Sequence, residues 1–267
     1  MNERVGVAKT IRSLVRILRS KPQIPASLAD QAMLKVIFRR RSIRSFSSQP
    51  IPDDVFGAIL EAGRLAPSTI NLQSWTFAVF DSGLWQQTFG RPIPFHGNRA
   101  VIVISDTYRY RQVFNEFPDC PLTEYTIGVM NASLAAMNMT VAAEALGVSS
   151  VMLSETGRSG ILDAKYLKET LHLPEGTVPL MTMVFGYARG AYPPMPPKLS
   201  MQQITMAGRY QPPDRAALQS WLEQMIVGYN ASHPGASFQG QVSIYRSKIN
   251  QAENDLKEMI FRREKQP

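Results

Sequence analysis

The sequence predicts a layered domain of the α/β or α+β class. Short apolar segments typical of buried strands are separated by segments whose apolar residues recur at helical spacing. The strand candidates are residues 75–80, 101–105, 148–153 and 178–187, and the main helix candidates are residues 53–65, 124–146 and 162–171. Apolar residues make up 44% of the 267-residue chain, which is enough for a substantial core. No apolar run approaches the ~18 residues of a membrane-spanning helix.

The positive charge belongs to the N-terminal segment rather than to the whole chain. The formal net charge is +8, but residues 1–50 alone carry eleven Lys and Arg against Glu3 and Asp30. The rest of the chain holds 18 basic and 19 acidic residues. The chain is therefore not a uniformly basic nucleic-acid binder, and we expect no nucleic-acid partner. The open alternative is that the basic N-terminal segment binds anionic lipid or nucleic acid.

Residues 5–19 form a basic amphipathic helix in this prediction, within an extension that covers residues 1–30. One face carries Val7, Ile11, Leu14 and Leu18, and most basic side chains lie off that face. We expect this stripe to pack on the body or on a second subunit. The alternative is contact with an anionic membrane or with a partner protein.

A basic cluster follows a predicted helix over residues 30–38. It consists of Arg40, Arg41, Ser42 and Arg44. Several guanidinium groups beside a hydroxyl suit a phosphate, although such runs are usually solvated faces. The next helix, residues 53–65, has Asp53 or Asp54 as its expected N-cap.

A polar loop then precedes the first strand. Its candidate binding residues are Pro67, Ser68, Thr69, Asn71 and Gln73. Their donors and acceptors suit the polar edges of a flat heterocycle, whereas the structural alternative is an ordinary helix–strand connection.

Other catalytic classes find no support in the composition. The chain has a single cysteine, Cys120, and three histidines, and none of them has zinc-ligand spacing. No nucleophile–histidine triad signature is present either. We interpret Cys120 as a structural or incidental thiol, and a single cysteine fits a reducing compartment.

The two polar motifs together resemble the flavin-dependent nitroreductase family. The family pattern is R-R-S-x-R, followed about two dozen residues later by P-S-x-x-N-x-Q-x-W-x-F, and residues 35–206 are similar to it overall. Family members usually have proline at the position of Ser74. The resemblance implies an α+β three-layer α-β-α sandwich with a mostly antiparallel sheet, here over residues 31–206. It also implies a homodimer that binds FMN at its interface, with residues 40–44 from one subunit and residues 67–73 from the other.

The same resemblance suggests roles for individual residues. Arg40, Arg41, Ser42 and Arg44 would hold the phosphate and ribityl chain, and one arginine would also reach the pyrimidine side of the flavin. Ser154 and Glu155 would offer main-chain groups towards flavin N5. Lys198, after a proline-rich run, would contact the phosphate. Each of these residues also has a purely structural reading, as a strand-end turn or a surface lysine.

Residues 106–121 are a candidate lid over the flavin. The possible ring contacts are Tyr108, Tyr110, Phe114 and Phe117, and the alternative is that they anchor a surface excursion. The small-residue helix over residues 124–146 would form the centre of the dimer. Family members usually carry an acidic residue near the start of this helix and Gln-Asn in its middle. Here these positions are Asn131, Met137 and Asn138, and two of the three depart from the family pattern.

The C-terminal region extends beyond the family core. The resemblance makes residues 202–206 the candidate for the strand that family members lend to the partner's sheet. Residues 207–267 form a helical extension, with helices expected after Pro212 and over residues 242–263. We expect this extension to wrap the partner subunit or to cover the site entrance.

The resemblance therefore implies a cytoplasmic FMN-dependent oxidoreductase. NAD(P)H would be the co-substrate, and a small planar electrophile such as a nitroaromatic or a quinone would be the acceptor, in a ping-pong sequence. The alternatives are a reductive dehalogenase or ene-reductase on the same fold, or a flavin-binding or partner-binding protein with little turnover.

Overall fold

The computed structural model describes residues 6–20, 22, 24–114, 119–154, 160–233 and 235–261. The chain forms two compact units, one made of residues 1–25 and 193–247 and the other of residues 26–192 and 248–267. The division into residues 1–30, 31–206 and 207–267 that the sequence suggests stays a prediction.

The larger unit is built on a four-stranded antiparallel sheet. Its strands are β1 (Trp75–Asp81), β2 (Arg99–Asp106), β3 (Ser149–Leu153) and β4 (Thr177–Gly186), in the order β1-β2-β4-β3. The two central strands, β2 and β4, are buried almost throughout, which explains their continuous apolar sequence. The expected strands and the antiparallel sheet are confirmed.

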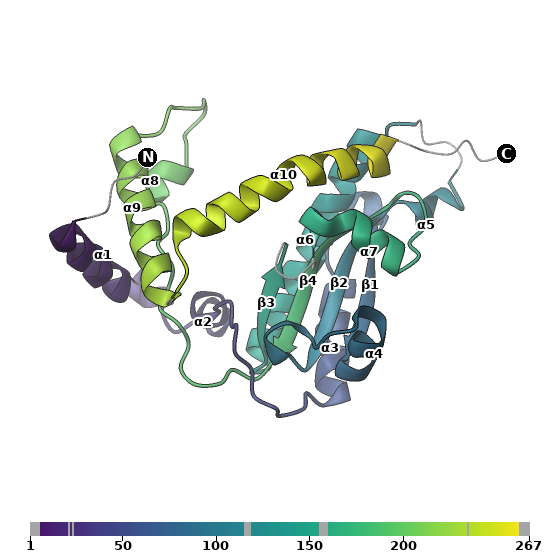
Figure 1. Ribbon diagram of the computed structural model, residues 1–267, viewed down its shortest axis with the longest axis horizontal. Helices are drawn as coiled ribbons and strands as arrows, with labels where there is room; N and C mark the ends of the chain where they lie inside the picture. The colour runs from purple at the N-terminus through teal and green to yellow at the C-terminus, as the bar shows by residue number, and fades with distance from the viewer. Residues whose placement is uncertain are drawn as a thin grey trace. The chain divides into compact units, whose positions relative to one another are not determined.

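Helices cover both faces of the sheet (Figure 1). On one face lie α3 (Asp53–Arg64) and α6 (Pro121–Ala145), packed on the side of β2 that carries Val101 and Val103. On the other face lie α4 (Ser82–Phe89) and α7 (Ala164–Thr170), over Ile102 and Ile104. Because strand side chains alternate between faces, one buried strand supplies both cores. The expected α+β three-layer sandwich is confirmed.

Helix α6 is the central helix of the first core. Its length and apolar composition would allow it to cross a membrane, yet Ala132, Ala135 and Met139 are completely buried against the sheet and α3. Close packing with α3 depends on Gly63, where an added Cβ would lie 2.7 Å from Cγ of Met139. These contacts are those of a core helix in a folded domain.

Three details differ from the sequence predictions. The N-cap of α3 is Pro52 without a side-chain cap, so neither Asp53 nor Asp54 caps the helix; both lie in its first turn, where they favour the helix dipole. Helix α4, capped by Asp81 through Leu84 N, was not expected. Residues Met201–Ile204 form a short helix, α8, where a strand over residues 202–206 was expected; that strand would form only by pairing with the sheet of a second chain.

The smaller unit is helical. It contains α1 (Val7–Arg19), α8, α9 (Arg215–Ser232) and the first part of α10 (Phe238–Phe261). Helix α1 packs on α9 through Ile17, next to Gly228, and an ion pair of 3.4 Å joins Lys9 Nζ to Glu223. The amphipathic helix is therefore confirmed, but its main apolar stripe, including Val7 and Leu18, is exposed.

Candidate functional site

The basic cluster follows α2 (Ala32–Arg39) and is attached to the edge of the sheet. Ser42 forms a parallel bridge with Ser150 of β3, and Ile43 N donates to Ser150 O at 3.1 Å. Ile43 is buried, whereas Ser42 is half-buried and Arg44 is exposed. In extended backbone, successive side chains point to opposite sides. Ser42 and Arg44 therefore face away from the core on a segment fixed by the sheet.

Arg41 has a structural role within this cluster. Its Nη1 donates to the carbonyl oxygens of Phe38, Arg39 and Arg40 at 2.7, 3.2 and 2.8 Å. These contacts satisfy carbonyls that the end of α2 leaves without helical partners. Burial lowers the pKa of the Arg41 guanidinium, and the positive charge of Arg40 lowers it further.

The cluster suits a phosphate group. Among the described residues, the buried Nε of Arg41 has no hydrogen-bond partner, and no ion pair engages Arg40 or Arg44. Like charges crowd here, as the effect of Arg40 on Arg41 shows. A dianionic phosphate would accept hydrogen bonds from these donors and relieve their repulsion. The donor set of this segment therefore fits the phosphate end of FMN.

Glu144, which the sequence analysis did not single out, holds the start of this segment. Its carboxylate is almost completely buried and accepts from Arg39 Nε at 2.8 Å and from the hydroxyl of Tyr192 at 3.2 Å. The Tyr192 hydroxyl also lies 2.8 Å from Ser149 Oγ. Burial is the main cause that raises the pKa of Tyr192. The sequence did contain a signal for this contact, because Glu144 lies among apolar residues of α6. A carboxylate that is buried there needs charged or hydrogen-bonding partners.

The polar loop of residues 67–73 is anchored to α6. Thr69 N donates to Oδ1 of Asn131 at 3.1 Å, and Nδ2 of this buried Asn131 donates to Ser74 Oγ at 2.8 Å. Within the loop, Gln73 N donates to Ser68 Oγ at 3.0 Å. The side chains of Pro67, Thr69, Asn71 and Gln73 are exposed.

The loop backbone is unusual. Ile70, Asn71 and Gln73 have positive φ values of 42°, 60° and 49°. A β-branched residue rarely adopts this conformation, and such backbone persists only where surrounding contacts hold it. The hydrogen bonds of Asn131 are such contacts. The sequence did not predict this role for Asn131.

The two motifs lie at opposite corners of the sheet within one chain. Ser42 lies beside Ser150 on the β3 edge, and the row of paired residues that contains Ser150 ends three strands away at Asp81. The polar loop enters β1 at Trp75, the other end of that strand. Three strand spacings of about 4.8 Å and six residues of about 3.3 Å give a diagonal of roughly 25 Å. The cluster and the loop of one chain are thus well separated.

The remaining predicted site residues are distributed as follows. Ser154 is exposed directly after β3, on the edge that holds Ser42, and its carbonyl accepts from Leu162 N at 3.2 Å. Glu155 lies outside the described residues. Lys198 belongs to the smaller unit, in the extended segment before α8.

The candidate lid is partly helical. Tyr108 and Tyr110 lie on α5 (Tyr108–Arg111); Tyr110 is 9% exposed, whereas Tyr108 and Phe114 are 38% and 46% exposed. Phe117 lies outside the described residues. Across the described part of the chain, no group of three His, Cys, Asp or Glu side chains is arranged to hold a metal ion.

Comparison with known proteins identifies the family of this chain. Residues 37–187 match the model of the nitroreductase family. A protein of Archaeoglobus fulgidus, whose name proposes an NADH dehydrogenase or NAD(P)H nitroreductase, is 33% identical over 162 residues, covering 58% of this chain and 85% of the relative. The NADPH-flavin oxidoreductase of Vibrio harveyi is 28% identical over 208 residues, covering 74% and 82%.

Solved structures share the fold. NfrA2 of B. megaterium has a TM-score of 0.72 at 21% identity, with 88% of this chain and all of that chain (100%) covered. The V. harveyi NADPH:FMN oxidoreductase, solved with NAD+, has a TM-score of 0.66 at 22% identity, with 83% and 98% covered. Since the family match extends over residues 37–187 and contains both polar motifs, this chain belongs to the nitroreductase family.

Proposed function

We propose that this protein is an FMN-dependent oxidoreductase that uses NAD(P)H to reduce small planar electrophiles such as nitroaromatics or quinones. The observation that carries the proposal is the position of Arg40 and Arg44, which no ion pair engages among the described residues, on either side of Ser42 at the edge of the sheet. Membership of the nitroreductase family supports it. When bound, FMN supplies hydride acceptance from NAD(P)H and then hydride donation to the acceptor, in a ping-pong sequence.

The chain contributes binding and orientation. Arg40 and Ser42 would bind the phosphate, and the role of Lys198 stays a prediction from the resemblance. Arg44, at the outer end of the cluster, would place positive charge beside the pyrimidine side of the flavin, where it stabilises a reduced anionic ring. The main chain at Ser154 and Glu155 would supply the donor towards N5.

A second copy of the chain would complete the site. The loop of residues 67–73 lies roughly 25 Å from Ser42 in its own chain, so it would serve the partner's flavin. Helix α6 supports this assembly, because Met130, Leu134 and Met137 form an exposed apolar stripe along it at helical spacing. Burying the exposed part of these side chains would remove apolar surface from water and favour association. We therefore propose a homodimer centred on α6.

The acceptor side is the less defined part of the site. Tyr108 and Phe114 expose aromatic rings that would stack on a planar acceptor, and the buried Tyr110 would hold α5 in place. The single cysteine, Cys120, is an exposed free thiol, which suits the cytoplasmic location that we propose.

A visible absorption spectrum followed by anaerobic additions of NADPH and NADH tests this function. We expect flavin bands in the purified protein and their rapid bleaching by at least one nucleotide. Flavin that stays oxidised with both would contradict a nicotinamide-dependent reductase and favour a binding role. The double variant Arg40→Ala/Arg44→Ala should lose FMN, and stoichiometric FMN in that variant would remove these residues from the site.

A further inference from the structure

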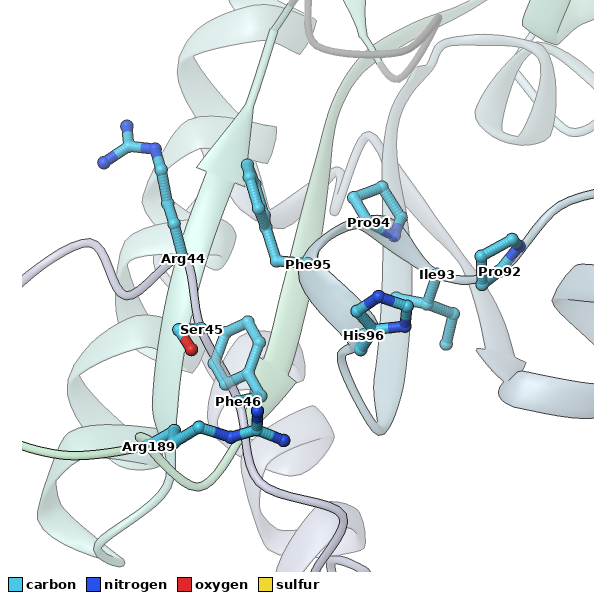
Figure 2. Close-up of a pocket in the computed structure, with 9 residues that line it drawn as sticks. All are labelled: Arg44, Ser45, Phe46, Pro92, Ile93, Pro94, Phe95, His96 and Arg189. Carbon is cyan, nitrogen blue, oxygen red and sulfur yellow. The ribbon is translucent and has the colours of Figure 1, made fainter. Parts of the chain in front are cut away.

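A pocket of about 380 Å³ lies in the larger unit, beside the basic cluster. Three segments line it: residues 44–46, residues 92–96 and Arg189 (Figure 2). Its volume is within the range of small-molecule sites. All of its lining residues belong to the described part of the chain.

Backbone contacts hold the walls of the pocket. Arg189 N donates to Ser45 O at 2.9 Å, and Phe46 pairs with Ala188. On the opposite wall, Gly97 allows close approach to the sheet, because an added Cβ would lie 2.1 Å from Cγ1 of Val184. The pocket is therefore fixed by the end of the sheet rather than by mobile side chains.

The wall formed by residues 94–96 has an unusual backbone. Phe95 and His96 have φ values of 58° and 57°, a conformation that bulky residues rarely adopt. This turn places the Phe95 ring and the His96 imidazole towards the pocket (Figure 2). Backbone outliers of this kind are concentrated at ligand sites.

The lining combines an apolar ring with an unpaired cation. The half-buried ring of Phe95 supplies flat apolar surface, whereas Phe46 is only 2% exposed and belongs to the core beneath the pocket. No ion pair or side-chain hydrogen bond engages the exposed Arg189 within the described residues. Arg44, by contrast, extends away from the wall of residues 92–96 (Figure 2). An aromatic ring beside a guanidinium group suits a phosphorylated nucleoside.

The pocket is within reach of the proposed flavin site. Residues 42–46 run from the β3 edge to the end of β4, and four extended residues span about 13 Å. A dinucleotide with one end at the flavin would follow this segment, and its other end would enter the pocket.

We propose that this pocket binds the phosphorylated adenosine end of NADPH and that Arg189 recognises its 2′-phosphate. The inference rests on the proposed function, because it needs NAD(P)H as co-substrate. It assigns to Arg189 a preference for NADPH over NADH, since NADH lacks the charged group that the guanidinium would bind. Loss of one charged hydrogen bond of this kind weakens ligand affinity about tenfold or more.

Anaerobic rapid mixing of the FMN-loaded protein with each nucleotide tests this specificity. In Arg189→Ala we expect the apparent Kd for NADPH to rise about tenfold or more. The Kd for NADH and the limiting rate of flavin reduction should stay as in the wild type. Equal effects on both nucleotides, or no effect on either, would overturn the proposal. Arg64→Ala is the matched control, because Arg64 is an exposed arginine of the same unit that does not line the pocket.

A direct binding measurement separates this inference from the proposed function. Calorimetric titration with adenosine 2′,5′-bisphosphate should show binding to the wild type and to Arg64→Ala, and about tenfold weaker binding to Arg189→Ala. Equal affinity in all three proteins, or no binding to the wild type, would refute the pocket assignment. A wild-type flavin that neither nucleotide reduces would instead refute the proposed function and leave this titration as the test of the pocket.

Discussion

The arginines between Arg39 and Arg44 have different partners although they are neighbours in sequence. Arg39 pairs with Glu144, and Arg41 donates to the end of α2, so Arg40 and Arg44 are the two arginines of this segment with neither kind of contact among the described residues. The sequence predicted the cluster because its composition is local. It did not predict this division of roles, because Glu144 is 105 residues away from Arg39.

His172 offers a test of backbone strain away from the site. It follows the C-terminus of α7 with φ at 50°, a position where helices prefer glycine. We expect His172→Gly to stabilise the fold by about 1 kcal/mol, which raises Tm by about 2–4 °C in a protein of this size. Thermal unfolding followed by circular dichroism measures it. Glu169→Gly, inside the same helix, should have the opposite effect, and a lower Tm for both variants would show that the strain at His172 is negligible.

Tyr125 on α6 should make stability sensitive to alkaline pH. Burial raises its pKa, so above about pH 10 the unfolded chain loses the phenolic proton first and the free energy of unfolding falls. We expect Tyr125→Phe to lessen this loss between about pH 9 and pH 11. Urea unfolding at several pH values measures it. Parallel pH profiles for the two proteins would show that the ring is hydrated enough to ionise normally.

At the scale of elements, the strands were the most predictable features. Residues 101–105 read as a strand buried on both faces, and β2 is buried along nearly its whole length. Helix α4 was missed because its eight residues bury only Trp85, which gives no repeated apolar spacing. The turns of residues 69–73 were predicted as a polar loop, but their left-handed backbone depends on Asn131 of a distant helix.

This anchor gives a prediction for the loop. Asn131→Ala removes the acceptor for Thr69 N and the donor to Ser74 Oγ, and it leaves buried polar groups without partners. We expect a loss of about 2 kcal/mol in the free energy of unfolding and weaker FMN binding. Chemical unfolding and a flavin titration measure the two effects. Unchanged FMN affinity in a destabilised variant would separate this loop from the cofactor.

The whole molecule is where sequence information is weakest. The family resemblance predicted the sandwich and its antiparallel sheet, both of which are confirmed. The placement of the two polar motifs depends instead on strand order and register, which join residues far apart in the chain. Residues 193–247 and 1–25 form a separate unit that no motif in the sequence explains.

Association of two chains should depend on the exposed stripe of α6. We expect Leu134→Asp to give a monomer that has lost FMN, because a buried charge at the interface is costly. Light scattering after size-exclusion chromatography, together with the flavin absorbance of each peak, measures both. Leu84→Asp is the control, since Leu84 is similarly exposed on α4. A monomeric Leu134→Asp protein with full FMN content would place the complete site within one chain.

The separation of the two motifs across the sheet has a thermodynamic consequence. If each flavin touches two chains, flavin binding and dimerisation are coupled. The factor by which dimerisation raises the affinity for flavin then equals the factor by which flavin raises the affinity between the chains. The apoprotein would then dissociate on dilution at concentrations where the holoprotein remains paired. Cofactor supply would thereby set how much of the protein is assembled, as well as how much is active.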